Sequence, residues 1–113
     1  MAEPIHLADY QFYVVAKVGE VPPGQRIFIN IGEEAIVLFN IAGQFFAIGD
    51  VCTHDGGQLG DGELEGHQII CPRHGARFDV RDGKALTLPA VVDTRSYPVI
   101  VNDDDVELGV PER

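Results

Sequence analysis

The stretch CTHDGGQL, residues 52–59, contains one of the chain's two cysteines, with one residue between it and a histidine. The other cysteine repeats this pairing in CPRHG, residues 71–75, with two residues between cysteine and histidine. Outside an oxidising compartment, a pair of cysteines serves a metal or redox site more often than a structural disulfide. Two short loops that each offer a thiolate and an imidazole together supply four ligands. The candidate metal ligands are Cys52, His54, Cys71 and His74.

The pairing of unlike ligands bears on the choice of metal. Zinc sites usually combine C-x2-C with H-x3-5-H, so that each pair consists of like residues. A two-iron cluster accounts for mixed pairs if each loop gives its cysteine to one iron and its histidine to the other. The glycines beside both pairs would let the backbone approach bridging sulfides closely, and Leu59 is a candidate apolar lid. A zinc-stabilised interaction module that uses the same four residues stays open as an alternative.

The sequence on both sides of the loops has the pattern of β-strands, whereas the segment around the first loop does not. Residues 49–66 contain six glycines and little apolar content, so this segment cannot build a core from its own side chains. Elsewhere, short apolar runs rich in β-branched and aromatic residues alternate with Gly, Pro, Asn and Asp. A three-residue turn, 42–44, is expected to form a hairpin. These patterns predict an all-β fold, a small antiparallel barrel or sandwich. The expected strands are 10–18, 26–31, 35–41, 45–48, 68–70, 76–80, 84–88, 95–101 and 106–110.

The stretches CTHDGGQL and CPRHGARFDVRDGKAL, residues 52–59 and 71–86, resemble the two cluster-binding loops of Rieske-type [2Fe–2S] ferredoxins. The likeness runs through the whole chain, with Leu88-Pro89-Ala90 where that family often carries a proline segment over the cluster. The resemblance implies one Rieske-type [2Fe–2S] cluster. In it Cys52 and Cys71 would bind one iron, and His54 and His74 the other.

Four departures from the high-potential members of that family concern the same loops. Gly57 and Arg73 stand where those proteins carry two further cysteines that bridge the loops. Ala76 and Phe78 stand where they carry a serine and a tyrosine whose hydroxyls donate to the cluster sulfurs. Fewer donors stabilise the added electron less, so the expected potential is low, on the order of −150 mV.

The resemblance implies a soluble ferredoxin that carries single electrons and has no substrate of its own. The expected donor is a flavin-dependent reductase, and the expected acceptor is a terminal oxygenase of the ring-hydroxylating dioxygenase type. A small Rieske subunit of another oxidoreductase, such as a nitrite-reductase-like complex, is an alternative. A Rieske oxygenase would need a mononuclear iron on two further histidines, and only His6 and His67 remain. Both are expected to be surface residues.

Length and charge bound the remaining possibilities. The 113 residues suit one domain, with cluster-binding loops at about 50–90 and a β base domain from 1–49 and 91–113. The net charge of −10 argues against nucleic acid and membrane as partners and suits docking on a basic protein surface. The sequence shows neither a long apolar run nor a secretory signal, so the cytoplasm is the expected location.

Overall fold

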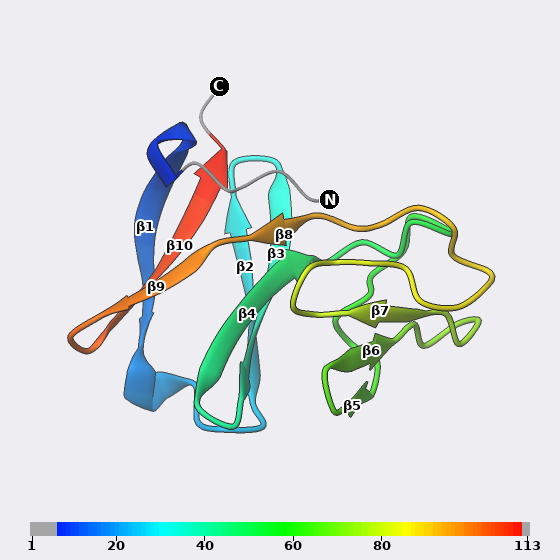
Figure 1. Cartoon of the computed structure of the whole chain (residues 1–113), viewed down its shortest axis with the longest axis horizontal. Helices are drawn as coiled ribbons and strands as arrows, with labels where there is room; N and C mark the ends of the chain where they lie inside the picture. The colour runs from blue at the N-terminus through cyan, green and yellow to red at the C-terminus, as the bar shows by residue number, and fades with distance from the viewer. Residues whose placement is uncertain (1–6, 112–113) are drawn as a thin grey trace.

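The structure, a computed structural model, describes residues 7–111, which form ten antiparallel strands and two short 3₁₀ segments (Figure 1). The all-β prediction is confirmed. Among the residues described, no helix is long and apolar enough to cross a membrane. The 3₁₀ segments are η1 Leu7–Asp9 and η2 Val18–Glu20, and the strands are β1 Tyr10–Lys17, β2 Arg26–Ile31, β3 Glu34–Ile41, β4 Gln44–Gly49, β5 Leu64–Glu65, β6 Gln68–Ile70, β7 Arg77–Asp79, β8 Ser96–Tyr97, β9 Val99–Asn102 and β10 Asp105–Pro111.

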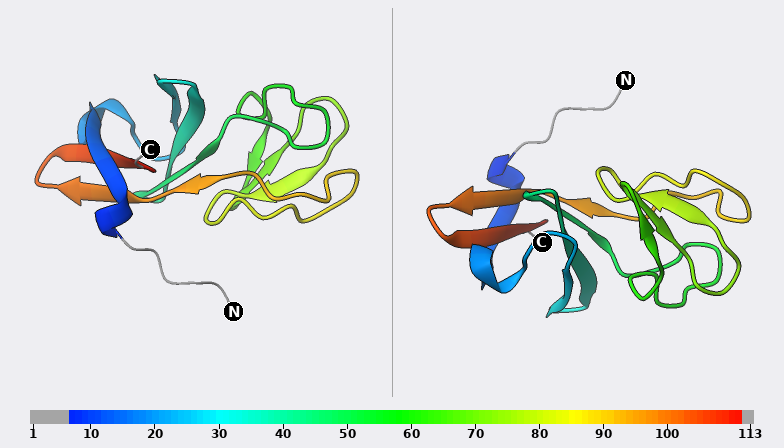
Figure 2. Two further views of the ribbon diagram at one scale, coloured as in Figure 1. Left: turned by 90° about the horizontal axis from the view of Figure 1, so that it is seen from above. Right: turned by 90° about the horizontal axis from the view of Figure 1, so that it is seen from below.

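The strands group into three sheets that divide the molecule along its length. One sheet has the order β1-β10-β9 and a second β2-β3-β4-β8; both lie at one end of the 38 Å long axis (Figure 1). The third sheet, β5-β6-β7, lies at the other end with the long loops around it (Figure 2). The loops that hold both cysteines therefore lie at one end of the molecule.

Strand β3 forms a wall between two hydrophobic cores. Val37 and Phe39 pack with both cysteines and the third sheet, whereas Ile36 and Leu38 pack with the β1–β10 side. Successive side chains of a strand point to opposite faces, so a continuous apolar run is what a strand buried on both faces requires. The apolar sequence of this strand thus couples the base to the cysteine loops.

The β3–β4 hairpin differs from its prediction by one residue. Ile41 pairs with Gln44, so the turn contains two residues, Ala42 and Gly43, rather than three. Their φ values are 54° and 90°, and two positive values in sequence suit the tight turns whose twist matches that of the strands. The strand pair itself was predicted correctly.

Two other strand predictions are wrong in part, and one strand was missed. The segment 84–88 contributes only an isolated bridge between Phe78 and Ala85 instead of a strand. The strand expected at 95–101 divides at Pro98, which has no N–H for the ladder, into β8 and β9 of different sheets. The two-residue strand β5 was not predicted, because it is too short for an alternating pattern to be recognised. His6 lies outside the described residues.

Candidate metal centre

The two cysteine–histidine loops close on themselves in the same way. The carbonyl oxygen of Cys52 accepts a hydrogen bond from the N–H of Gly56 at 2.7 Å, and that of Cys71 accepts one from Gly75 at 3.0 Å. Each cysteine N–H in turn donates to the carbonyl five residues ahead, at 2.8 and 2.7 Å. Gly56 and Gly75 both have φ of 75°, a conformation that glycine adopts without strain. The two loops are therefore geometrically matched.

Matched closure fixes which residues correspond between the loops. His54 is the third residue of its loop and occupies the position of Arg73 in the other. Asp55 is the fourth residue and occupies the position of His74. The two histidines thus sit at different positions of equivalent loops, and the remaining two positions are taken by an acid and a base.

The structure brings the two thiols together in an apolar interior. Cys52 is 0% exposed and Cys71 1%, and both belong to one buried cluster that includes Leu59. Leu59 is itself fully buried, as the interpretation of it as a lid requires. Burial, reinforced by the neighbouring Cys71 thiol, raises the pKa of the Cys52 thiol. A metal would have to displace that proton to bind.

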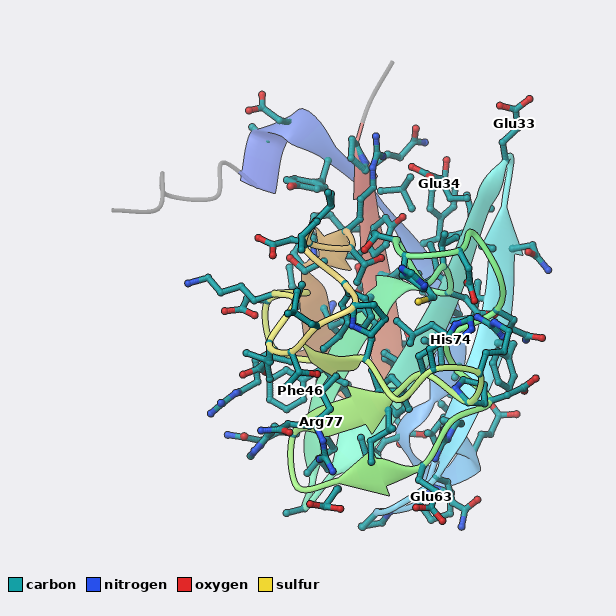
Figure 3. All side chains as sticks on the ribbon, turned by 90° about the vertical axis from the view of Figure 1, so that its right-hand side faces the viewer. Glu33, Glu34, Phe46, Glu63, His74 and Arg77 are labelled. Atoms are coloured by element: carbon teal, nitrogen blue, oxygen red, sulfur yellow. The ribbon has the colours of Figure 1, made fainter. Side chains whose placement is uncertain are left out.

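The structure also brings the two imidazoles together. The rings of His54 and His74 lie 5.0 Å apart between centroids, at 87° to each other, and both residues are exposed. Figure 3 looks onto this end of the molecule and shows His74 at its surface. Two buried thiols and two exposed imidazoles on matched loops are the donor types of a cluster bound by two cysteines and two histidines. The residues present fit such a cluster.

Asp55 is a residue of this site that the sequence analysis did not single out. One of its carboxylate oxygens lies within 4.8 Å of both cysteine sulfurs. Its oxygens are engaged by protein donors, namely the Arg73 guanidinium at 2.6 and 3.0 Å and the Gly57 N–H at 2.9 Å. The Arg73 guanidinium holds the pKa of Asp55 well below its usual range. Asp55 is therefore an anion that pairs across the loops.

Two residues outside the loops brace the segment that carries Leu59. Asp50 accepts hydrogen bonds from the N–H groups of Leu59 at 3.2 Å and Gly60 at 2.6 Å. Arg26, on β2, donates to the carbonyls of Gly60 at 2.5 Å and Gly62 at 2.7 Å. Arg26 lies outside the glycine-rich segment and Asp50 near its start, and together they supply the organisation that its few apolar side chains lack.

His67 takes no part in the grouping of ligands. Its ring packs edge-on against Phe46 at 5.7 Å between centroids, in the turn between β5 and β6. It is half-buried rather than exposed, so the expectation of a surface histidine is only partly met.

Exposed apolar side chains border the histidine end. Thr53 donates a hydrogen bond to the carbonyl of Val92, which ties the segment 88–92 to the first loop. Within that segment Ala90 is buried in the same cluster as both cysteines, whereas Leu88 and Val91 are each 77% exposed. The segment runs beside the first loop in two views (Figures 1 and 2). We call the exposed side chains of Leu88, Val91 and Val92 the apolar rim.

Comparison with known proteins agrees with this geometry. A family model described as the Rieske [2Fe-2S] domain matches residues 11–98. The ferredoxin component of naphthalene 1,2-dioxygenase/salicylate 5-hydroxylase systems from Ralstonia sp is 37% identical over 93 residues, which are 82% of this chain and 89% of that protein. The 3-phenylpropionate/cinnamic acid dioxygenase ferredoxin subunit of Escherichia coli (strain K12) is 40% identical over 96 residues, 84% of this chain and 90% of that one.

Solved structures show the same architecture. The ferredoxin of carbazole 1,9a-dioxygenase from Nocardioides aromaticivorans IC177 superposes with a TM-score of 0.82 and 28% identity, covering 89% of this chain and 98% of that one. The protein also superposes on a chain from the complex of reduced oxygenase and oxidised ferredoxin in carbazole 1,9a-dioxygenase. The TM-score is 0.83 and the identity 28%, and the match covers 90% of this chain and 95% of that one. The chain belongs to the family of Rieske [2Fe-2S] domains, and its cofactor is one [2Fe–2S] cluster.

Proposed function

We propose that this protein is the ferredoxin of a ring-hydroxylating dioxygenase-type system. It would carry single electrons from a flavin-dependent reductase to a terminal oxygenase and act on no substrate of its own. Two relatives of similar length bear the names of such components, and their matches cover 82% and 84% of this chain. The cytoplasm is the proposed location, because a reducing compartment keeps free the two thiols that a cluster requires.

The proposed ligands are Cys52 and Cys71 for one iron, and His54 and His74 for the other. The observation that carries this assignment is the matched pair of loops, which gathers the thiols inside and the imidazoles outside. A bound cluster of this type accepts and releases one electron. The apolar cluster around the thiols keeps water from that side of the site. The exposed imidazoles leave a short path for an electron from the site to a partner. In this proposal residues 50–90 form the cluster-binding part of a single domain whose base is 1–49 and 91–113.

The apolar rim is the proposed docking surface for the partner proteins. Its segment is hydrogen-bonded to the first loop, and several exposed apolar side chains near a functional site are typical of an interaction surface. A partner seated on the rim would also lie next to the first loop, which carries His54. Acidic residues elsewhere on the chain would steer a basic partner towards it.

The first experiment asks whether the purified protein carries the cluster on these residues. Anaerobically prepared protein is expected to contain two irons and two acid-labile sulfides per chain, to absorb visible light, and to give an EPR signal when reduced. Cys52→Ser and His74→Ala should abolish or alter that signal, whereas His67→Ala should leave it unchanged. A colourless, EPR-silent protein that contains zinc would contradict the proposal.

The second experiment tests the electron path. Ferredoxin, a flavin-dependent reductase and a terminal oxygenase are combined, and aromatic hydroxylation is measured with each component omitted in turn. Product formation that needs all three components is the expected result. Cluster-loaded protein that cannot be reduced by any such reductase, or cannot support any such oxygenase, would contradict the proposed role.

A further inference from the structure

An ion pair crosses between the two matched loops. Asp55 comes from the first loop and Arg73 from the second, and their contact is bidentate, at 2.6 Å to Nε and 3.0 Å to Nη2. The side chains are 21% and 37% exposed, so the pair is only partly open to water. Two parallel hydrogen bonds to a planar guanidinium fix orientation as well as distance. This pair therefore sets how the loops face each other.

Gly57 completes a built site for the guanidinium. Its N–H donates to Asp55 at 2.9 Å and holds the carboxylate in place. A Cβ at this position would lie 2.6 Å from Arg73 Cζ, so the guanidinium occupies the space that any other residue would fill. Gly57 and Arg73 are the positions where the resemblance places bridging cysteines in high-potential relatives, and here they are in contact through this packing. Exposed ion pairs between long side chains usually contribute little to stability. In this pair the Gly57 N–H also holds the carboxylate, and the backbone at Gly57 packs against the guanidinium.

The same guanidinium also reaches a sulfur of the site. Arg73 Nη2 lies 3.5 Å from Cys71 Sγ, within hydrogen-bonding distance for sulfur. One side chain thus contacts an acid of the first loop and the cysteine of its own loop. Between Arg26 and Arg73 the sequence has seven acidic residues and no basic one, so Arg73 brings positive charge to the end of a stretch of chain whose other charges are all negative.

We propose that Arg73 is a positioning residue that clasps the two loops through Asp55 and sets the reduction potential through its contact with Cys71. A cationic donor directed at a thiolate stabilises the more negative, reduced state more than the oxidised state. The second half of this inference rests on the proposed assignment of Cys71 as a cluster ligand. The first half, the clasp, rests on the contacts alone.

The test compares Arg73→Gln and Arg73→Lys with Arg77→Gln in the full-length, cluster-loaded protein. Arg77 is a matched control: it lies on β7, and its side chain binds Glu65 and Gln68 instead of Asp55 and Cys71, so its replacement removes the same charge without removing those two contacts. The reduction potential is measured by titration with visible or EPR detection. Arg73→Gln should lower the ratio of reduced to oxidised protein at a fixed potential at least threefold, about 28 mV for one electron, since a tenfold change equals about 59 mV.

Arg73→Lys separates charge from geometry. Lysine keeps the positive charge but cannot make the planar fork, so its potential should lie between those of Arg73→Gln and the unmodified protein. It also keeps the test usable if Arg73→Gln fails to take up the cluster. A potential of Arg73→Gln equal to that of Arg77→Gln would overturn the contact with Cys71 as a determinant of potential.

The clasp has its own readout, which is the rate at which an iron chelator bleaches the visible absorption. Asp55→Asn and Arg73→Gln should each bleach at least threefold faster than the unmodified protein, and the double variant no faster than the faster single variant, because both remove one interaction. Equal rates in all four proteins would overturn the clasp. Absence of iron from the unmodified protein would instead overturn the ligand assignment, an outcome distinct from the other two.

Discussion

At the scale of single residues, Ala76 and Phe78 limit the number of donors around the two thiols. Both are fully buried in the apolar cluster that contains Cys52 and Cys71, and neither side chain can donate a hydrogen bond. Ala76→Ser and Phe78→Tyr should each raise the reduction potential. One added hydrogen bond of about 1 kcal/mol corresponds to a rise of about 40 mV for a one-electron couple.

The measurement is a redox titration of each variant beside Ala85→Ser. Ala85 packs at the edge of the same cluster, so this control adds an identical hydroxyl outside the closed turns 52–57 and 71–76. A rise in all three variants, or in none, would contradict the view that donors near the thiols set the potential. A starting potential well above zero in the unmodified protein would count against the same view.

A second residue-scale prediction concerns Asp79. Its carboxylate accepts three hydrogen bonds from Arg81, from the backbone N–H and from both sides of the guanidinium at 2.8 to 3.0 Å, and these lower the pKa of Asp79 below its ordinary value. A group whose pKa falls on folding stabilises the protein above its ordinary pKa and loses that contribution as pH falls through the folded value. Asp79→Asn should lower the melting temperature by a few degrees.

The pH profile distinguishes the charge from the shape of the side chain. The gap in melting temperature between the two proteins should stay constant from pH 7 to about pH 5, and it should narrow only as the pH falls below about 4, the ordinary value of an aspartic acid. Calorimetry at a series of pH values gives the gap. A gap that already closes between pH 7 and pH 6 would contradict the assignment to Asp79.

The spacing of cysteine and histidine was sufficient to choose the two loops that the structure brings together, and the assignment of Cys52, His54, Cys71 and His74 as ligands stays a prediction. The Asp55–Arg73 contact could not be predicted from the sequence, because it joins residues 18 positions apart and depends on how two separate loops face each other. Arg73 could be interpreted equally well as a partner contact or as an exposed loop residue. The rule that would have found the pair is charge complementarity at the two loop positions not taken by histidine.

At the scale of elements, strands with strong alternation or a continuous apolar run were predicted closely. The strand β2 has its predicted bounds, with Ile27, Ile29 and Ile31 half-buried on one face and Phe28 exposed on the other. Weakly patterned segments were not. The segment 84–88 is held by one bridge and by the Arg77 N–H, which donates to the Thr87 hydroxyl at 2.9 Å. It therefore contacts β7 at separate points and does not form a continuous ladder with it.

The element-scale prediction concerns the braced segment that ends at Gly62. A Cβ at Gly62 would overlap the carbonyl oxygen of Ile70, the last residue of β6, so the segment and the strand would have to separate. Gly62→Ala should therefore cost about 2 to 3 kcal/mol of unfolding free energy, as overpacking against rigid neighbours does. It should also speed bleaching by a chelator, because the segment carries Leu59.

Gly19→Ala is the control for this change. A Cβ at Gly19 meets nothing within 4 Å, so this substitution should leave stability within about 0.5 kcal/mol. Urea unfolding monitored by circular dichroism compares the three proteins. Equal stability of Gly62→Ala and Gly19→Ala would show that the close approach of segment and strand is not a constraint.

At the scale of the whole molecule, charge and shape act at different distances from the partner. The net charge of −10 favours attraction to a basic surface before contact. Turnover in the reconstituted system, at ferredoxin concentrations below KM, should fall as salt rises from about 0.01 to 0.15 M, because the screening length shrinks from about 30 to about 8 Å. Turnover that does not respond to salt would exclude electrostatic steering.

The apolar rim acts once the partners touch, and the prediction that it yields does not depend on salt. Leu88→Ser combined with Val91→Ser should raise the KM for ferredoxin roughly tenfold, about 1.4 kcal/mol, because two side chains that are each 77% exposed lose their apolar contact with the partner. This effect should persist at high salt, and the reduction potential should not change. Val101→Ser is the control, since Val101 is 48% exposed on β9, at the end of the molecule away from the histidines (Figure 1). An equal rise in KM for the control would mean that the contact surface is not the rim, and the proposed docking geometry would have to be abandoned.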